Sequence, residues 1–306
     1  MKILANDGLD IKAIEEFNKK NIEVDTNHYD KEKLIEVINQ YDVLIVRSAT
    51  KVNKEVIDAA RGTKLKLVIR AGVGLDNIDV EYAKKNGLIV TNTPNASSNS
   101  VAELVLGHML GLSRFIAISN VTMREGIWNK KSYVGVEIFG KTLGIIGFGR
   151  IGKALANKAT ALGMKVIFYD KFIKEDENYP YFPMEDVLKE ADFISLHVPD
   201  TGRPLIGRDE LALMKDGVFI INAARGGVID EEALLEALEA DKVAGAGLDV
   251  YATEPGPNIE LCNHPRVSCT PHIGAATEEA QERIGEEIVD IVMDYYANNK
   301  IRTIAI

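Results

Sequence analysis

The sequence predicts an α/β protein of two domains, each with a mostly parallel sheet flanked by helices. Short apolar runs alternate with segments of helical periodicity along most of the chain, as in repeated strand–helix units. A stretch rich in Pro, Asn and Ser at 93–100 interrupts this alternation once and divides it into two blocks. The 306 residues are also enough for two domains, each with its own core.

The first block predicts a complete small α/β domain. Its expected strands are 2–5, 22–26, 42–47, 65–70 and 88–90. After the break, Ser100 and Glu103 have the spacing of a capping box, so a helix is expected from there to about residue 118. Because this helix is apolar nearly all round, we expect it to be buried between the domains. The segment from Gly126 to Gly140 lacks periodicity and is expected to be an arm or a loop against a second subunit.

The second block predicts a larger domain. Its expected strands are 142–147, 165–170, 192–198, 217–224, 242–250 and 266–270. A final helix at about 277–297 carries an apolar stripe and is expected to cross back and pack on the first domain. The smaller domain is then discontinuous, 1–97 plus 279–306, and the larger domain, 98–278, is inserted into it. We expect the substrate cleft at their junction.

The composition argues against several classes of partner. A net charge of −10 disfavours nucleic acids and anionic membranes, which select basic surfaces. Glu103 and His108 interrupt the longest apolar stretch, so no membrane span is expected, and the N-terminus lacks the apolar region of a signal peptide. Cys262 and Cys269 lack metal-ligand spacing. We therefore expect free thiols, no metal and a cytoplasmic location.

Gly147, Gly149 and Gly152 form a G-x-G-x-x-G that follows an expected strand and opens a helix. In a dinucleotide site the first glycine permits the turn, the second lets the pyrophosphate approach the backbone and the helix N-terminus, and the third lets helix and strand pack closely. Asp170, at the end of the next strand, can accept the ribose hydroxyls and would repel a 2′-phosphate, which favours NAD over NADP. The neighbouring Lys171 argues the other way. This pattern predicts a Rossmann-like dinucleotide-binding domain. The alternative is that the three glycines form only a structural turn in an α/β domain.

Chemistry is expected at the carboxyl ends of the strands, where open α/β sheets bind ligands. His272 follows the last expected strand and is a candidate acid/base for a carbonyl–alcohol interconversion. Arg225 ends another strand and can bind a carboxylate bidentately, the alternative being a surface arginine. Glu254, past a third strand, can hold the His272 imidazole in one tautomer. We expect His108 to pack, and His197 either to pack or to line an adenine pocket.

The first domain offers cations at its own ligand edge. Arg47, just before Ser48, and Arg70, just before a Gly-Val-Gly turn at 72–74, both end expected strands. The turn can present N–H groups to an anion. Two arginines on this edge suit a phosphate at the far end of a substrate, although either alone is most simply a surface residue. Lys130 is a further candidate, from a neighbouring subunit.

These residues lie in segments that resemble the D-isomer-specific 2-hydroxyacid dehydrogenases, and the resemblance covers essentially the whole chain. The segments are 70–79, 140–156, 222–234, 244–255 and 270–281. Segments 46–52, 89–103 and 270–281 are most similar to the D-3-phosphoglycerate dehydrogenase branch of that family. The resemblance implies a cofactor domain inserted into a discontinuous substrate domain, both Rossmann-like or flavodoxin-like.

The resemblance also implies roles for individual residues. Arg225 would bind the substrate carboxylate and polarise the carbonyl, His272 would be the acid/base, and Glu254 its partner. Together with the edge residues above, the expected substrate-binding residues are Arg47, Ser48, Arg70, Gly72, Val73, Gly74, Arg225 and His272. Besides the three glycines of the turn, the expected cofactor-binding residues are Val73, Arg150, Ile151, Asp170, Val198, Ala223, Ala224, Arg225, Asp249, His272, Gly274 and Ala275.

The activity that the resemblance implies is the NAD-dependent oxidation of D-3-phosphoglycerate to 3-phosphohydroxypyruvate, the first step of serine biosynthesis, by a homodimer formed through the cofactor domain. The family's serine-binding regulatory domain does not follow residue 306, so no inhibition by serine is expected. Two alternatives stay open. One is a reductase of glyoxylate, hydroxypyruvate or 2-oxoglutarate on the same scaffold, and the other is a non-enzymatic NADH-sensing regulator, like the transcriptional corepressors that share this fold.

Overall fold

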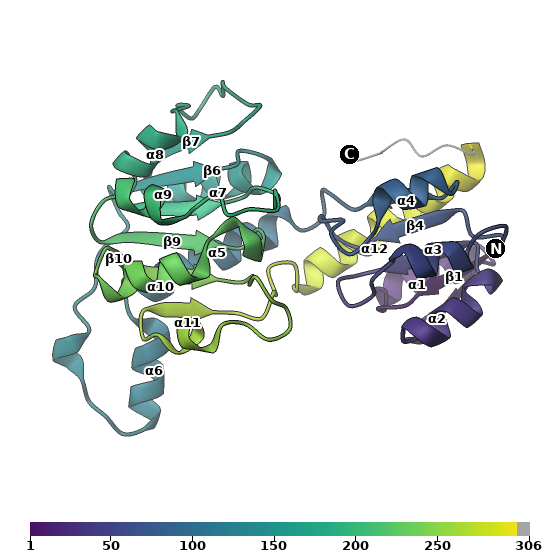
Figure 1. The fold of residues 1–306 in the computed structure, drawn as a ribbon, viewed down its shortest axis with the longest axis horizontal. Helices are drawn as coiled ribbons and strands as arrows, with labels where there is room; N and C mark the ends of the chain where they lie inside the picture. Colours follow the sequence, from purple (N-terminus) through teal and green to yellow (C-terminus); the bar gives the residue numbers. More distant parts are fainter. Residues whose placement is uncertain (299–306) are drawn as a thin grey trace. The chain divides into compact units, whose positions relative to one another are not determined.

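The protein is described by a computed structural model over residues 1–298. It divides into two compact units. Unit 1 comprises Met1–Ser97 and the chain from Ala275 onward, and unit 2 comprises Ser98–Gly274 (Figure 1). Unit 2 ends at Gly274, four residues before the expected end of the larger domain at residue 278. The Gly274 N–H is bonded to Asp249, which keeps this residue with unit 2.

Unit 1 is built on a parallel five-stranded sheet. The strands are β1 (Lys2–Ala5), β2 (Glu23–Asp25), β3 (Val43–Val46), β4 (Leu67–Arg70) and β5 (Ile89–Asn92). All of them were predicted. Their order is β2-β1-β3-β4-β5, the flavodoxin-like arrangement, and the direction of winding reverses between β1 and β3. The carboxyl ends of these strands form the ligand edge of the sheet.

Helices cover both faces of the unit 1 sheet. They are α1 (Ile11–Lys19), α2 (Lys31–Val37), α3 (Lys54–Ala59), α4 (Val80–Lys85) and α12 (Glu278–Asn298). Successive strand residues point to opposite faces, so Ile3 packs with α1 and α12 whereas Leu4 packs with α2, α3 and α4. The buried Ile284 and Ile288 confirm that the last helix packs on the sheet of the first unit.

Unit 2 contains a parallel six-stranded sheet. Its strands are β6 (Thr142–Ile146), β7 (Lys165–Tyr169), β8 (Phe193–Leu196), β9 (Val218–Asn222), β10 (Val243–Leu248) and β11 (Val267–Cys269), in the order β11-β10-β9-β8-β6-β7. A single parallel bridge from Phe168 to Tyr181 extends the sheet beyond β7. With that bridge as a rudimentary strand, the winding is that of a Rossmann domain, with its switch point between β6 and β8. The predicted α/β class is confirmed for both units.

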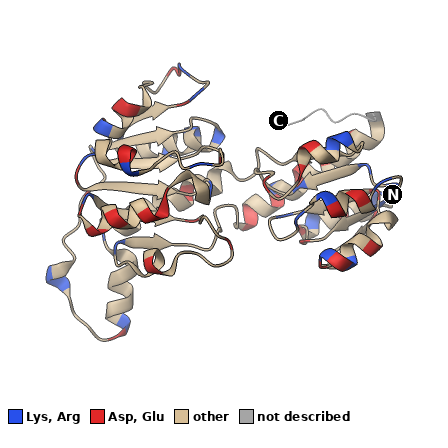
Figure 2. Ribbon diagram, in the orientation of Figure 1, with Lys and Arg blue, Asp and Glu red and all other residues tan. Residues whose placement is uncertain are grey.

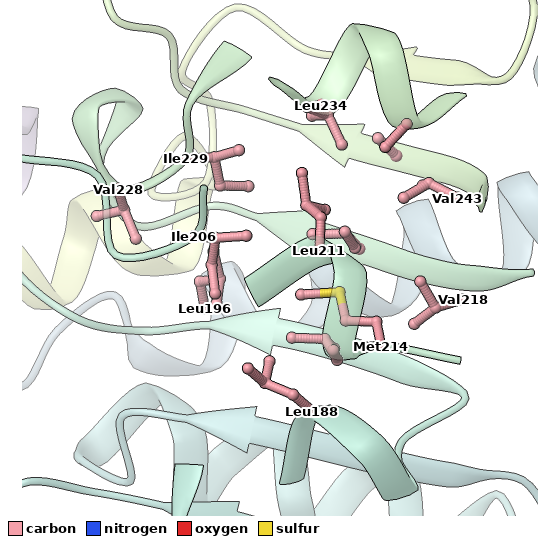
Figure 3. Packing of buried hydrophobic residues seen from close by; sticks show 14 of the residues in the cluster. Leu188, Leu196, Ile206, Leu211, Met214, Val218, Val228, Ile229, Leu234 and Val243 are labelled. Atoms are coloured by element: carbon pink, nitrogen blue, oxygen red, sulfur yellow. The ribbon is translucent and has the colours of Figure 1, made fainter. Parts of the chain in front are cut away.

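The helices of unit 2 also form two layers. They are α5 (Ser98–Ser113), α7 (Arg150–Ala161), α8 (Met184–Glu190), α9 (Arg208–Leu213), α10 (Glu231–Glu239) and α11 (Ile259–Asn263). Helices α5 and α7 share one apolar cluster with the sheet. The opposite face packs on α8, α9 and α10, and Figure 3 shows Leu188, Leu211 and Leu234 from these helices as parts of one apolar cluster over the strands.

The expected single helix at 100–118 is wrong in two respects. Helix α5 begins at Ser98, so Ser100 lies buried inside it and does not cap it. The helix then stops because Phe115 adopts a left-handed conformation, and a separate helix, α6 (Ile116–Arg124), follows at a bend of 62°. Within residues 1–298 no single helix is long and apolar enough to cross a membrane, and α5 and α6 meet that test only as a bent pair.

The segment after α5 projects from unit 2 (Figure 1). None of the residues of α6 is buried, and the chain from 126 to 140 contains only one short 3-10 helix, η2 (Lys130–Ser132). Figure 2 shows Lys and Arg interspersed with Asp and Glu on the helices of both units. No group of His, Cys, Asp or Glu in the described part of the chain is arranged to hold a metal ion, and both cysteines are free thiols.

Candidate active site

Three neighbouring strands of unit 2 bring Arg225, Glu254 and His272 to one edge of the sheet. These residues follow β9, β10 and β11, which are adjacent and parallel. The loops touch closely at Gly226, where a Cβ would lie 1.9 Å from the backbone of Tyr251, so only glycine fits. This contact places the Arg225 loop against the loop of Glu254, and the charge of Arg225 acts on that carboxylate.

Glu254 is fixed from both sides of its carboxylate. Oε1 accepts the Tyr251 N–H at 2.8 Å, and Oε2 pairs with Nδ1 of His272 at 2.7 Å. Partial burial by itself would raise the pKa of Glu254, but the hydrogen bonds from His272 and Tyr251 and the nearby Arg225 charge hold that pKa below its ordinary value. An ionised Glu254 can only accept, so Nδ1 of His272 carries a proton and Nε2 is the ring atom left to exchange one.

The His272 backbone has φ +55°, in the left-handed region that a non-glycine residue enters at a cost of roughly 1 kcal/mol. Hydrogen bonds on both sides hold it there. The His272 N–H donates to Thr270 O at 3.1 Å, and the next two N–H groups, of Ile273 and Gly274, each donate to Asp249 at 2.8 Å. The imidazole itself is 38% exposed, so a substrate can reach it.

Asn222, the last residue of β9, sets the path of the chain through Arg225. Its Nδ2 donates to Arg225 O at 2.8 Å, and its Oδ1 accepts the Ala224 N–H at 3.1 Å. One guanidinium nitrogen of Arg225 donates back to Ala224 O at 2.6 Å. The Arg225 side chain is half-buried, and hydrogen bonds hold the backbone from which it extends. A group that orients a carboxylate requires such a fixed position.

The glycine turn after β6 fits a dinucleotide. A Cβ on Gly147 would lie 2.4 Å from His197 O, and one on Gly152 would lie 2.4 Å from Gly147 O, so both positions are closed to larger residues. Gly149 has open space around its missing side chain and is the N-cap residue of α7, where no side chain caps the helix. This open helix N-terminus can receive the diphosphate of the cofactor.

Asp170 is held against this turn. Its Oδ2 accepts the Phe148 N–H at 2.8 Å, and its Oδ1 accepts the N–H groups of Phe172 and Ile173. Partial burial alone would raise the pKa of Asp170, but these three donors lower it below its ordinary value. Oδ2 keeps a lone pair for a ribose hydroxyl. The Lys171 ammonium lies over the Phe172 ring, 5.5 Å from its centre.

The other residues expected to bind the cofactor in unit 2 lie at the same edge. Arg150 and Ile151 form the first turn of α7. Val198, Ala223, Ala224, Asp249 and Gly274 follow the carboxyl ends of β8, β9, β10 and β11. Val73 and Ala275, which were expected in the same set, belong to unit 1.

In unit 1, Arg70 folds back over the Gly72 turn. Gly72 has φ +144°, and the position of its absent Cβ is 1.3 Å from a guanidinium nitrogen of Arg70. The carbonyls of the turn point toward β5, since Asn92 Nδ2 donates to Val73 O at 2.5 Å and Thr93 N donates to Gly72 O at 3.0 Å. In trans peptides the N–H lies opposite the C=O, so the N–H groups after these carbonyls face the other way. The turn therefore offers N–H donors beside a cation.

The comparisons with known proteins agree with this geometry. The profile of the D-isomer specific 2-hydroxyacid dehydrogenase NAD binding domain matches residues 106–274. A hydroxypyruvate reductase of Thermotoga maritima is 50% identical over 94% of this chain and 96% of its own. This chain belongs to the D-isomer-specific 2-hydroxyacid dehydrogenase family. It carries the family's NAD-binding domain.

Other members of the family are similar at lower identity. A D-3-phosphoglycerate dehydrogenase of Methanocaldococcus jannaschii is 46% identical over 98% of this chain, which spans 59% of that longer protein. The solved D-lactate dehydrogenase of Aquifex aeolicus, complexed with NAD and lactic acid, is 31% identical, with a TM-score of 0.85 over 98% of this chain and 96% of that one. The branch of the family is therefore not decided by similarity: the reductase is more similar than the phosphoglycerate dehydrogenase that the sequence motifs favoured.

Polar residues that support the ligand edge of this dehydrogenase were missed in the sequence. Asp7, just after β1, accepts the N–H of Arg47 at 2.7 Å and the hydroxyl of Thr50 at 2.6 Å. Asn77 donates to Arg47 O at 2.6 Å. Asn92 ends β5. For Asp7 and Asn92 the available signal was position, because each lies at or just beyond a strand end at the ligand edge, whereas Asn77 lies within the loop between β4 and α4. Ser48 and Lys130 are exposed, and Lys130 lies on the projecting arm.

Proposed function

We propose that this dehydrogenase interconverts D-3-phosphoglycerate and 3-phosphohydroxypyruvate with NAD. The observation that supports this choice is the pair of arginines at the ends of adjacent strands β3 and β4, with Arg70 lying on the Gly72 turn. A substrate that carries a carboxylate and a phosphate needs more than one cationic or N–H site. Unit 1 offers such donors in addition to Arg225 of unit 2. Phosphoglycerate dehydrogenases among the relatives support the same choice.

In the proposed mechanism Arg225 binds the substrate carboxylate and, as the alcohol is oxidised, stabilises the developing carbonyl oxygen. Bound NAD supplies the acceptor for the hydride that leaves C2. Nε2 of His272 removes the hydroxyl proton, and ionised Glu254, bonded to Nδ1, stabilises the imidazolium that forms. In the reverse direction the same imidazolium returns the proton to the oxygen.

A second candidate is the reduction of hydroxypyruvate, which the 50% identical relative favours. Values of kcat/KM for 3-phosphohydroxypyruvate, hydroxypyruvate, glyoxylate and 2-oxoglutarate distinguish the two, with NADH oxidation followed by absorbance. Our proposal predicts the highest value for the phosphorylated acid. A higher value for hydroxypyruvate would replace the proposal with the second candidate. Tight NADH binding without turnover of any acid would indicate a regulator instead.

We further propose that the chain forms a homodimer through its cofactor domain, in the cytoplasm. The projecting arm exposes several large apolar side chains, and a partner surface commonly covers such residues. They are Ile116, Val121, Met123, Trp128, Val134 and Phe139. A second copy of the chain is the occupant we propose. Sedimentation should give the mass of two chains, and Trp128→Glu should lower the dimer's stability. A monomer at micromolar concentration would contradict this proposal.

A further inference from the structure

His108 is a buried histidine of α5 that the mechanism above does not use. Its side chain reaches the last strand of the sheet, 160 residues later in the chain. Nδ1 lies 2.9 Å from Ser268 Oγ, and Nε2 lies 3.1 Å from Thr270 Oγ1. The space for it depends on Gly247 in β10, where an added Cβ would lie 2.7 Å from the Cβ of His108. Both ring nitrogens of the buried imidazole therefore have a polar partner on the segment that leads to His272.

The direction of each hydrogen bond follows from the number of protons available. The Thr270 hydroxyl donates its one proton to Asp249 Oδ1 at 2.6 Å. It must therefore accept from His108, which places a proton on Nε2 and leaves Nδ1 to accept from Ser268. Burial lowers the pKa of His108 below its ordinary value, more than the Asp249 charge raises it, so the ring is neutral at pH 7. A single tautomer satisfies every group.

Asp249 connects the Thr270 hydroxyl to the loop of His272 by hydrogen bonds. It is 1% exposed, and besides the Thr270 hydroxyl it accepts the N–H groups of Ile273 and Gly274. These two N–H groups directly follow His272, whose left-handed backbone depends on its neighbours. The position of the Asp249 carboxylate therefore sets the position of the His272 loop, and the Thr270 hydroxyl orients that carboxylate.

We propose that His108 is a positioning residue, which acts through Thr270 and Asp249 to hold the His272 loop in its working conformation. The proposal rests on the role of His272 in the proposed function. His108 touches neither substrate nor cofactor in this account. Its contribution is to orient the Thr270 hydroxyl, so that Asp249 accepts a hydrogen bond from it and keeps its hydrogen bonds to both N–H groups of the loop.

The kinetic test uses matched variants. Thr270→Val removes the hydroxyl at nearly constant volume and should lower kcat about tenfold, whereas Thr270→Ser, which keeps the hydroxyl, should stay within about twofold of wild type. His108→Leu should lower kcat about fivefold. Because His108 acts through Thr270, the double variant His108→Leu/Thr270→Val should be no slower than Thr270→Val alone. Additive losses, or His108→Leu with unchanged kcat, would overturn the proposal.

A second readout does not depend on turnover. Amide hydrogen exchange of the peptide 271–276 should become about tenfold faster in Thr270→Val and in His108→Leu, and stay unchanged in Thr270→Ser, while exchange in α7 stays the same in all three. If the wild-type protein turns over no 2-oxo acid, the proposed function fails, and the exchange pattern still decides whether the network exists. Unchanged exchange at 271–276 in an active enzyme would overturn the network alone.

Discussion

The carboxyl edges of the two sheets are built differently. In unit 2 polar residues such as Asn222 fix the backbone, and two of the candidate site's own side chains, His272 and Glu254, also bind each other at 2.7 Å. In unit 1 polar residues likewise fix the backbone, as Asn92 does for Val73, and the candidate groups are arginine side chains and N–H groups of the turn. Proton transfer depends on the separation of two atoms, whereas binding an anion tolerates some movement of a long cation. The two constructions fit a division between chemistry and binding.

The largest effect is expected at the chemical edge. His272→Asn removes the proposed acid/base, so kcat should fall at least about a hundredfold while NADH still binds normally. The matched control is His264→Asn, a change in another loop histidine of unit 2, which should keep kcat within about twofold. Stopped-flow kinetics and quenching of protein fluorescence by NADH measure the two quantities. Near-native kcat in His272→Asn would remove this residue from the mechanism.

The cofactor site should discriminate strongly by charge. Asp170 is ionised and held against the glycine turn, so a 2′-phosphate would meet a fixed negative charge. We expect kcat/KM with NAD to exceed that with NADP roughly a hundredfold. Asp170→Ala should reduce this ratio. Equal values with both cofactors in the wild type would show that a nearby cation such as Lys171 compensates the carboxylate.

A smaller effect, with a direction in pH, is expected for Glu254→Gln. The interaction that holds the pKa of Glu254 low also stabilises the protonated imidazole, and glutamine cannot supply that charge. Reduction needs the protonated form of His272. The alkaline limb of the reduction profile should therefore move to lower pH, and kcat should fall about tenfold. A limb that stays in place, or moves up, would mean that Glu254 does not act on His272.

The smallest effect is expected at the binding edge. Asn92→Ala frees the Val73 carbonyl and disorders the N–H donors of the turn, so KM for 2-oxo acids should rise about fivefold with kcat nearly unchanged. Asn86→Ala, at the exposed end of α4, is the control and should change neither value. A loss confined to kcat would place Asn92 with the chemistry, and the division between the two edges would fail.

Regular features of the fold were readable in the sequence, and contacts across the chain were not. Strands were predictable because apolar runs of strand length are local, and the ends of those strands pointed to Arg225, Glu254 and His272. The break at Phe115 gives no local signal, because any non-glycine residue there would be expected to continue the helix. The partners of His108 lie 160 and 162 residues away, so only the folded chain reveals them.

The most direct test of the division is a ratio of two substrates. The kcat/KM for 3-phosphohydroxypyruvate divided by that for hydroxypyruvate should fall about tenfold in Arg47→Ala, through a higher KM for the phosphorylated acid. The ratio should stay at its wild-type value in Glu254→Gln, which slows both substrates alike, and in Arg61→Ala, an exposed arginine away from the edge. Equal losses on both substrates in Arg47→Ala would contradict the account, and would move the hydroxypyruvate reductase ahead of our proposal.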